Sequence, residues 1–398
     1  MKSRNSLSIG LIWSQFAAYH VDRCEAVARR FDGRASVLAI EVATTSHDYA
    51  WEPSGAVAGA RKVTLFPGQA FDAISPWARF RRMLRAVRGC DVICIGLSYG
   101  VVDAILLSWT LRVMGKQVVV FSESKFDDTR RSAWFELFKG AVLSCYNAAI
   151  VGGRRHIEYF RYLRFGRRQV LPGYDCVGLD RIRAQAGGAL APQGVAFEAR
   201  PFVFVGRFVG KKNLVTLVEG YARYVELAGK HARRLILAGS GEQEAELRQR
   251  ADELGILAML DFPGFLGAEA VAQTLAGALA LVLVSREEQW GLVVNEALAC
   301  GLPAIVSDEV GSRDLLVRNL VNGFVVESSS REGIAQAMQQ LSADRVRWEA
   351  MVAQSHARAW MGDAERLADA LELLLYPDSR EAAERVGHLM HEMELTTK

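Results

Sequence analysis

The sequence predicts an α/β protein of two domains, each built on a parallel sheet. Its 398 residues exceed what one hydrophobic core usually holds, since a typical domain has roughly 150 residues. A hydrophobic share of 51% and a charged share of 23% are typical of a globular chain. In both halves short apolar segments alternate with helical ones, and this alternation is typical of parallel strands joined by crossover helices.

The first half contains six apolar segments with strand character. They are residues 8–12, 36–40, 62–65, 92–95, 118–121 and 148–151. Helical patterns separate most of them, at residues 20–30, 76–88, 101–114 and 131–146. This order predicts a parallel sheet with helices on both faces, and we assign residues 1–183 to the first domain.

The second half repeats the plan after a segment rich in Ala, Gly and Pro. That segment, residues 184–200, is the expected linker. The expected strands are residues 202–205, 234–237, 260–262, 279–284, 303–306 and 323–326. We assign residues 201–374 to the second domain and residues 375–398 to a separate C-terminal helix.

Composition argues against a membrane span, a secreted chain and a metal site. Asp91, Asp103 and Arg112 interrupt the longest apolar region, so no stretch reaches the roughly 18–20 apolar residues of a membrane helix. The N-terminus lacks the long apolar segment of a signal peptide. The six cysteines show no paired spacing, and no His or acidic partner completes a metal site at Cys90 and Cys94. We therefore expect a cytoplasmic protein without a bound metal.

Charge is distributed unevenly along the chain. Residues 1–190 hold 27 Lys and Arg against 16 Asp and Glu, whereas the remainder holds 21 against 29. Two basic clusters, residues 79–88 and 154–168, also contain aromatic residues. They fit a solvated helix face, a surface that binds anionic lipid head groups on the inner face of the membrane, or a nucleic-acid patch. No nucleic-acid-binding motif accompanies them, so we expect no nucleic-acid partner.

Glu288 and Glu296 form a Glu-x7-Glu pair between an expected strand and an expected helix. The apolar run 279–284 is typical of a buried parallel strand, and residues 295–299 have the pattern of a helix closed by Gly301 and Pro303. We expect Glu288 at the carboxyl end of the strand, where open α/β sheets bind ligands, and Glu296 at the helix start facing the same crevice. Carboxylates accept hydrogen bonds from hydroxyl groups, so the pair suits a hydroxyl-rich ligand such as a sugar.

A second motif lies upstream, where the strand 202–205 runs into a glycine turn. Gly206 and Arg207 open the turn, and Lys212 follows five residues after Arg207. The two cations suit a diphosphate, because arginine binds phosphate oxygens in a fork and lysine adds a point charge. The alternative is a pair of solvated surface cations, which is what we expect for Lys211.

Together these motifs resemble the retaining glycosyltransferases of family 4, whose members pair a Glu-x7-Glu stretch with an upstream Gly-Arg-x4-Lys loop. The resemblance continues through residues 238–242, 306–312 and 321–326, and it covers residues 201 to about 330. It implies the GT-B fold, in which two Rossmann-like domains face each other across an interdomain cleft. It also implies that the second domain holds the donor and that a C-terminal helix returns to the first domain.

The resemblance also implies roles for the motif residues. Arg207 and Lys212 would stabilise the leaving diphosphate, Glu288 would contact the transferred sugar, and Glu296 would bind the ribose hydroxyls. The alternative for Glu296 is a role at the positive end of a helix dipole. Trp290 would either cover the sugar or pack internally. The remaining donor-binding residues would be Gly206, Gly239, Gln289, Gly291 and Leu292.

The acceptor side departs from the family. The family places a glycine-rich turn after the first strand, whereas residues 9–23 contain one glycine, Gly10, in a polar and aromatic loop. We expect this loop to shape the acceptor pocket. His20 and Asp22 are candidate groups for acceptor activation, and Glu123, after another strand, is a second acid/base candidate. His20 could equally cap a helix, so the choice stays open.

The resulting prediction is a metal-independent, retaining hexosyltransferase in polysaccharide or glycolipid biosynthesis. It would move a sugar from a UDP- or GDP-sugar, used as substrate and without a further cofactor, to a glycan or lipid-linked acceptor. Two alternatives remain: a sugar-nucleotide epimerase of the same fold and a non-catalytic sugar-nucleotide-binding protein. A nicotinamide dehydrogenase is disfavoured because the turn at Gly239 and Gly241 lacks a third glycine. An ATPase is disfavoured because no Ser or Thr follows Lys212.

Overall fold

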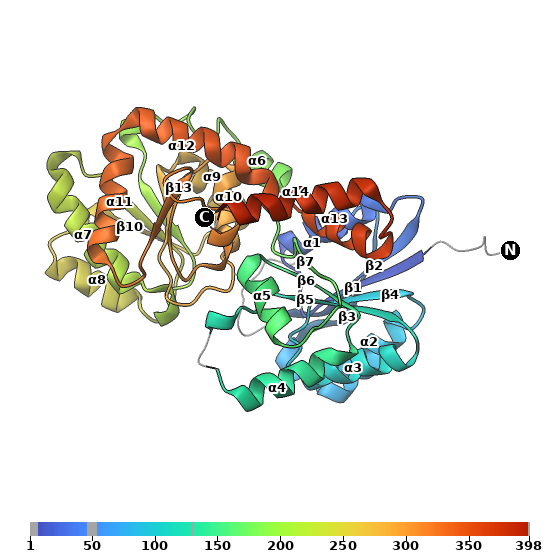
Figure 1. Ribbon diagram of the computed structural model, residues 1–398. Helices are drawn as coiled ribbons and strands as arrows, with labels where there is room; N and C mark the ends of the chain where they lie inside the picture. Colours follow the sequence, from blue (N-terminus) through green and yellow to red (C-terminus); the bar gives the residue numbers. More distant parts are fainter. Residues whose placement is uncertain (1–6, 46–53, 129–130, 397–398) are drawn as a thin grey trace. The chain divides into compact units, whose positions relative to one another are not determined.

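The computed structural model describes residues 7–45, 54–128 and 131–396, which form two compact units (Figure 1). Unit 1 comprises the described residues up to Phe126, residues 131–177 and Ala364–Met390. Unit 2 comprises Gly178–Asp363, together with Asp127, Asp128 and the residues from His391 onward. Each unit contains a parallel sheet covered by helices, so the predicted α/β class with two Rossmann-like domains is confirmed.

Unit 1 is built on a parallel sheet of order β3-β2-β1-β4-β5-β6-β7. Its strands are β1 (Leu7–Trp13), β2 (Ala35–Thr45), β3 (Arg61–Ala70), β4 (Val92–Ile95), β5 (Gln117–Ser122), β6 (Ala148–Val151) and β7 (Val170–Pro172). Leu11 of β1 pairs with Ala39 on one side and with Cys94 on the other. The sequence prediction missed β7, because three residues ending in proline at a sheet edge carry almost no strand signal.

Helices cover both faces of this sheet. They are α1 (Ala18–Arg30), α2 (Pro76–Val87), α3 (Val102–Val113), α4 (Ala133–Val142), α5 (Arg154–Tyr162), α13 (Glu365–Leu375) and the first part of α14 (Arg380–Thr396). In Figure 1, α1 and α13 pack against each other on one face, while α2 and α3 pack together on the other. Right-handed crossovers between parallel strands produce this two-sided cover.

The C-terminal segment of unit 1 is part of its core. Leu367 and Leu371 of α13 are fully buried in one apolar cluster with Val27 of α1 and Ile9 of β1. The C-terminal segment was expected to begin at residue 375. Unit 1 instead includes the chain from Ala364 onward, because the apolar face of α13 is buried against α1.

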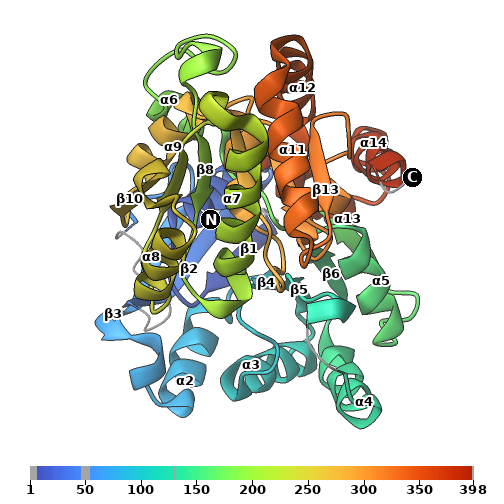
Figure 2. The same ribbon diagram turned by 90° about the vertical axis from the view of Figure 1, so that its left-hand side faces the viewer.

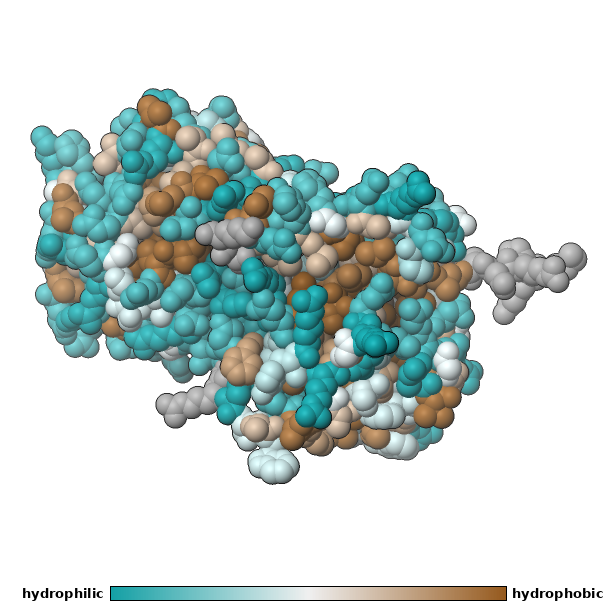
Figure 3. Space-filling model, viewed as in Figure 1, coloured by the Kyte–Doolittle hydropathy of each residue, from teal (hydrophilic) through white to brown (hydrophobic). Residues whose placement is uncertain are grey.

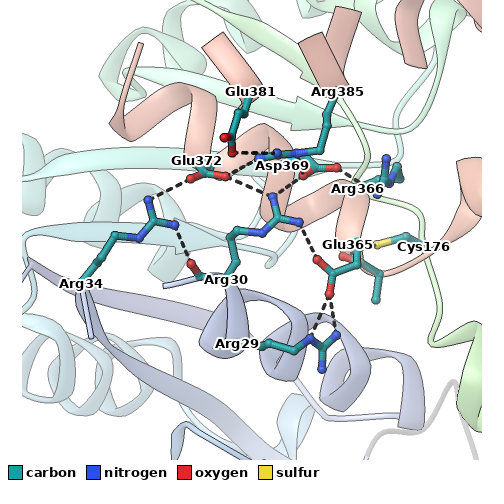
Figure 4. Close-up of polar contacts among 11 residues, drawn as sticks. Arg29, Arg30, Arg34, Cys176, Glu365, Arg366, Asp369, Glu372, Glu381 and Arg385 are labelled. Carbon is teal, nitrogen blue, oxygen red and sulfur yellow. Dashed lines mark hydrogen bonds and ion pairs between the residues drawn. The ribbon is translucent and has the colours of Figure 1, made fainter. Parts of the chain in front are cut away.

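An ionic network also joins α1, α13 and α14 (Figure 4). Arg30 of α1 lies between Glu365 (2.7 Å), Glu372 (3.1 Å) and Asp369. Arg385 of α14 contacts Asp369 and Glu372, each at 2.6 Å. The carboxylates of α13 are therefore shared between cations of two other helices.

Unit 2 is built on a second parallel sheet, of order β10-β9-β8-β11-β12-β13. Its strands are β8 (Phe202–Val205), β9 (Leu235–Ala238), β10 (Leu260–Gly264), β11 (Ala280–Leu283), β12 (Ala304–Ser307) and β13 (Gly323–Val326). Its helices are α6 (Leu179–Gln185), α7 (Leu214–Ala228), α8 (Glu244–Glu253), α9 (Ala268–Gly277), α10 (Leu292–Ala299), α11 (Arg331–Ala343) and α12 (Arg345–Arg358). Figure 2 shows α7 and α11 side by side.

The segment expected as a linker belongs to unit 2. Its side chains are partly buried: Phe197 packs against the ring of Trp348, and Arg200 donates to the carbonyls of Ala276 and Ala278. The unit boundary in this part of the chain lies at Gly178, because Leu179 and Ile182 anchor α6 against α9 and α10.

Both sheets have a topological switch point. The chain first adds strands on one side of β1 and then returns to the other side at β4, and it does the same around β8 at β11. Loops that leave neighbouring strands in opposite directions open a crevice at the carboxyl ends of those strands, which is where open α/β sheets bind ligands. Of the described helices, none is both long and apolar enough to cross a membrane.

Candidate functional site

The carboxyl edge of the sheet in unit 2 brings the two predicted motifs together. The Gly206–Asn213 loop follows β8, and the loop that carries Glu288 follows β11, on either side of the switch point. The Lys212 ammonium forms an ion pair with the Glu288 carboxylate, and the Ser285 hydroxyl donates to the same oxygen at 3.0 Å. Glu288 is 9% exposed, so this charge pair is largely shielded from water.

Backbone contacts lock these two loops to each other. Asn213 adopts a left-handed conformation with φ of 61°. Its side-chain amide donates to the carbonyls of Val284 (3.0 Å) and Ser328 (2.6 Å). The amide of Arg286 donates to the carbonyl of Lys211 at 2.8 Å. The position of Lys212 relative to Glu288 is therefore set by the backbone and not by the two long side chains alone.

Glycines allow the neighbouring β8 and β9 loops to approach closely. A Cβ atom on Gly239 would lie 1.9 Å from the carbonyl oxygen of Gly206, where no atom fits. The amide of Phe208 donates to the carbonyl of Ser240 at 2.8 Å. Gly206 and Gly239 thus lie against each other at the same sheet edge as Lys212.

Residues 289–292 form the turn that enters α10. Gly291 has φ of +93°, and a Cβ atom there would lie 2.8 Å from Leu283. Trp290 is 2% exposed, and its indole donates to Asn295 at 2.9 Å. Of the two interpretations of Trp290, internal packing agrees with this geometry. Gln289 is exposed on the turn, and Gly311 contacts its carbonyl so closely that no side chain fits there.

Glu296 is not at the start of its helix. Helix α10 begins at Leu292, so Glu296 lies in the second turn, and the first turn contains no acidic residue. The predicted placement is wrong because the apolar residues 292–294 continue the helix toward Gly291, which the sequence pattern assigned to the loop. A helix-dipole role for Glu296 is therefore excluded, since that effect fades after the first turn. Glu296 is half-buried on α10, and Arg207 is exposed at the start of the β8 loop.

The two acid/base candidates, His20 and Glu123, lie in unit 1. His20 is 4% exposed, and its Nδ1 accepts a hydrogen bond from the amide of Ala17 at 2.9 Å. Burial lowers the pKa of His20 well below its usual value, and the charge of Arg23 lowers it further. His20 is therefore a neutral residue that caps α1.

Glu123 belongs to a buried charge cluster that the sequence did not predict. It follows β5, while Asp175 follows β7, and burial raises the pKa of Asp175 well above its usual range. The charge of Glu123 raises that pKa further, whereas Arg23, whose guanidinium lies 3.7 Å from Asp175, lowers it. Because burial and Glu123 outweigh Arg23, Asp175 resists ionisation.

Aromatic rings enclose this cluster. The Arg23 guanidinium lies over the rings of Tyr19 (4.8 Å) and Tyr174 (4.5 Å). The Trp13 indole donates to the Tyr174 hydroxyl at 3.0 Å. These groups come from the carboxyl ends of β1 and β7 and from α1. Sequence reasoning missed Tyr174 and Asp175 because β7, which positions them, was itself missed.

Metal-ligating groups do not gather in the described ranges. Within residues 7–45, 54–128 and 131–396, no three His, Cys, Asp or Glu side chains form a group that could hold a metal ion. The six cysteines are buried, and burial raises the pKa of the Cys300 thiol to about 12.

Comparison with solved structures identifies the class of fold. The structure of HepE from Anabaena in complex with UDP superimposes with a TM-score of 0.68 at 16% identity, over 93% of this chain and 99% of that one. The two parallel-sheet units therefore have the GT-B fold of glycosyltransferases.

Sequence comparisons assign part of unit 2 to a family of glycosyltransferases. Residues 193–358 match the family described as glycosyl transferases group 1. The lipopolysaccharide core biosynthesis glycosyltransferase LpsE of Rhizobium meliloti is 33% identical over 140 residues, 35% of this chain and 38% of LpsE. A D-inositol 3-phosphate glycosyltransferase of Streptomyces griseus is 28% identical over 288 residues, 69% of this chain and 59% of that protein. The chain thus covers less than two thirds of the length of these two relatives, and the family match lies within unit 2.

Proposed function

We propose that this protein is a retaining, metal-independent glycosyltransferase of family 4. It transfers a hexose from a UDP- or GDP-sugar to a glycan or lipid-linked acceptor in polysaccharide or glycolipid biosynthesis. The observation that carries the proposal is the Lys212–Glu288 pair at the switch point of unit 2, because it joins the two motifs of the resemblance in one site. The match of residues 193–358 to the group 1 glycosyltransferases supports the same conclusion.

The donor contacts follow from the chemistry of the site. Arg207 and Lys212 supply two positive charges to the diphosphate, and the amides of the turn before α10 add hydrogen-bond donors at a helix N-terminus. Glu296 binds the ribose hydroxyls from α10. HepE was crystallised with UDP and with UDP-glucose, which favours a uridine nucleotide for this chain as well.

Lys212 exchanges its partner when the donor binds: it leaves the Glu288 carboxylate and contacts the diphosphate. Before the donor binds, each charge neutralises the other in a poorly hydrated place. A diphosphate carries more negative charge than one carboxylate, so Lys212 turns to the phosphate oxygens when the donor binds. Glu288 is then released to accept a hydrogen bond from a sugar hydroxyl, while the Ser285 hydroxyl continues to donate to the carboxylate oxygen that Lys212 has left.

The transfer step needs few further groups. The bond between the anomeric carbon and the diphosphate oxygen breaks, the acceptor oxygen attacks on the same face, and the departing diphosphate takes the acceptor proton. Arg207 and Lys212 stabilise the charge that develops on the diphosphate, and well-aimed contacts of this kind are worth about 3–4 kcal/mol of barrier.

Of the two candidates in unit 1, the surroundings favour Glu123 over His20 for a contact with the acceptor hydroxyl. His20 is buried, and its Nδ1 is occupied by the amide of Ala17. Glu123 is half-buried at the end of β5, beside Asp175, which stays protonated more readily than an ordinary carboxyl. A half-buried carboxylate in this position can accept a hydrogen bond from the acceptor hydroxyl.

The test is a transfer assay with UDP- and GDP-hexoses and a bacterial lipid extract as acceptor. The anomeric configuration of the product is read by NMR. A product with the donor's own configuration supports retention, and an inverted product refutes it. Activity that EDTA abolishes and manganese restores would refute metal independence.

A further inference from the structure

Helix α4 of unit 1 is packed with its polar side inward. Trp134 and Phe138 are 82% and 61% exposed, and Phe135 and Leu137 are also exposed. Glu136, between them, is buried and contacts Tyr159 (2.6 Å), Lys139 (3.0 Å) and Arg131 (3.5 Å). Burial would raise the pKa of Glu136, but hydrogen bonds from Tyr159 and Lys139 outweigh it and lower that pKa. A buried ion pair therefore holds α4 against the rest of unit 1, and the apolar side of α4 faces outward. In a typical surface helix the apolar side faces the core.

Helix α3 adds a second exposed apolar line. Val102, Leu106, Trp109 and Val113 are exposed and follow one another at spacings of four, three and four residues. Residues at this spacing share one face of a helix. In Figures 1 and 2, α2, α3 and α4 follow one another along the same border of unit 1, and apolar atoms lie along this border in Figure 3.

The exposed charges on helices α2, α3 and α4 are all positive. Helices α2, α3 and α4 contain two acidic residues, Asp103 and Glu136, and both are buried in ion pairs. Their exposed arginines are Arg81, Arg82, Arg85 and Arg112. The outward surface of these helices thus combines aromatic and aliphatic side chains with cations and carries no exposed carboxylate.

A groove of about 490 Å³ runs between α4 and the end of α5. Apolar residues dominate its lining, which includes Ala133, Leu137, Ala141 and Leu163, and Arg164 adds a cation. The two segments approach closely at Gly140, where a Cβ atom would lie 2.9 Å from the carbonyl oxygen of Leu163. The lining also includes Glu136, whose carboxylate is paired with Lys139 and Arg131, so the groove combines an apolar wall with the cation of Arg164.

We propose that the outward face of α2, α3 and α4, with the α4–α5 groove, docks unit 1 on an anionic lipid bilayer. The aromatic side chains of α3 and α4 enter the head-group region, and the arginines contact lipid phosphates. A second copy that pairs through the same face fits poorly, because its cations would meet cations. Only the biological reason for this docking rests on the proposed function, because a lipid-linked acceptor is presented at a membrane.

Flotation with vesicles tests the docking directly. The purified full chain is mixed with vesicles of phosphatidylcholine alone or of phosphatidylcholine with an equal part of phosphatidylglycerol. We expect binding to the anionic vesicles that weakens at high salt. The double variant Trp134→Ser/Phe138→Ser should weaken that binding by about a hundredfold, since burial of each of the two aromatic side chains contributes on the order of one tenfold step. Phe265→Ser, an equally exposed aromatic position of unit 2, serves as the matched control and should bind like the parent.

Two outcomes overturn the docking proposal. One is that the parent chain binds both kinds of vesicle equally well, or binds neither kind. The other is anionic binding that the double variant leaves unchanged, which would indicate charge attraction without insertion. UDP titration of the same samples separates the two proposals: a double variant that binds UDP normally is folded, whereas a parent chain that binds vesicles but no nucleotide refutes the proposed function alone.

Discussion

The exchange of partners by Lys212 predicts an unusual division of effects for Glu288→Gln. Glutamine keeps the shape and the hydrogen bond to Ser285 but removes the charge that neutralises Lys212. Lys212 no longer has to leave an ion pair when a diphosphate binds, so UDP alone should bind as well as before or better, by up to about 1 kcal/mol or roughly fivefold. The sugar loses a hydrogen bond to a charged acceptor, which is worth about 1.5–3 kcal/mol. Transfer should therefore fall by roughly tenfold to 150-fold.

The assay compares UDP affinity by calorimetry with the initial rate of sugar transfer in the same preparation. Glu287→Gln is the matched control, because Glu287 is the adjacent carboxylate and is exposed on the same loop. It should change neither quantity. If Glu288→Gln weakens UDP binding as much as it slows transfer, Glu288 supports the nucleotide and not the sugar, and the partner exchange is wrong.

Three further predictions concern stability. Gly239→Ala should lower the free energy of unfolding by about 1–3 kcal/mol in a denaturant titration, because the added Cβ would lie 1.9 Å from the Gly206 carbonyl oxygen. Gly210→Ala is the control, because the space around Gly210 is open. Equal losses of stability in the two variants would contradict the steric explanation. Burial and Arg23 depress the pKa of His20, so the stability that neutral His20 contributes should be present above about pH 6.5 and decline as the pH falls below it. His20→Asn, which keeps an acceptor for the Ala17 amide, should flatten that part of a pH series of thermal unfolding, and an unchanged slope would show that His20 is not the titrating group. Asp369→Ala should lower the free energy of unfolding by about 3 kcal/mol, because it leaves the cations Arg30, Arg366 and Arg385 without their shared carboxylate. Glu381→Ala, at the exposed end of the network, is the control and should cost under about 0.5 kcal/mol. Similar losses in the two variants would mean that the buried part of the network contributes little.

Much of the fold could be predicted because its strands are locally distinctive. Strands β4, β6, β8 and β13 have the predicted bounds, since each is a short apolar run bounded by polar, glycine or proline residues. The alternation with helices then determines a parallel sheet. β7 was missed because an edge strand of three residues has too few side chains to show a period.

The site could be predicted in part. The placement of Lys212 and Glu288 at one sheet edge follows from the rule that carboxyl ends of parallel strands meet. The ion pair between the two side chains was not predicted, because the sequence motifs assigned them to different parts of the donor. The cluster of Arg23 and Asp175 was not expected, because its members are 152 residues apart and meet through β7. The start of α10 was also misplaced, since Gly291 permits a helix entry that the apolar residues after it do not reveal.

The outward apolar side of α4 was equally hidden. A sequence pattern shows that apolar and polar residues occupy different sides of a helix, but it assigns the apolar side to the core by default. Here the buried ion pair of Glu136 with Lys139 reverses that assignment, and such a pair depends on tertiary contacts that a sequence pattern does not contain.

Calorimetric titration of UDP and GDP into the parent chain, Lys212→Ala and Lys211→Ala tests the donor site most directly. Lys211 and Lys212 are adjacent cations on one loop, but only Lys212 is paired with Glu288 among the contacts of the described residues. We predict that one nucleotide binds the parent and Lys211→Ala alike and that Lys212→Ala loses at least about tenfold in affinity. Failure of both nucleotides to bind the parent, or equal losses in the two lysine variants, would contradict a diphosphate site at this edge of unit 2.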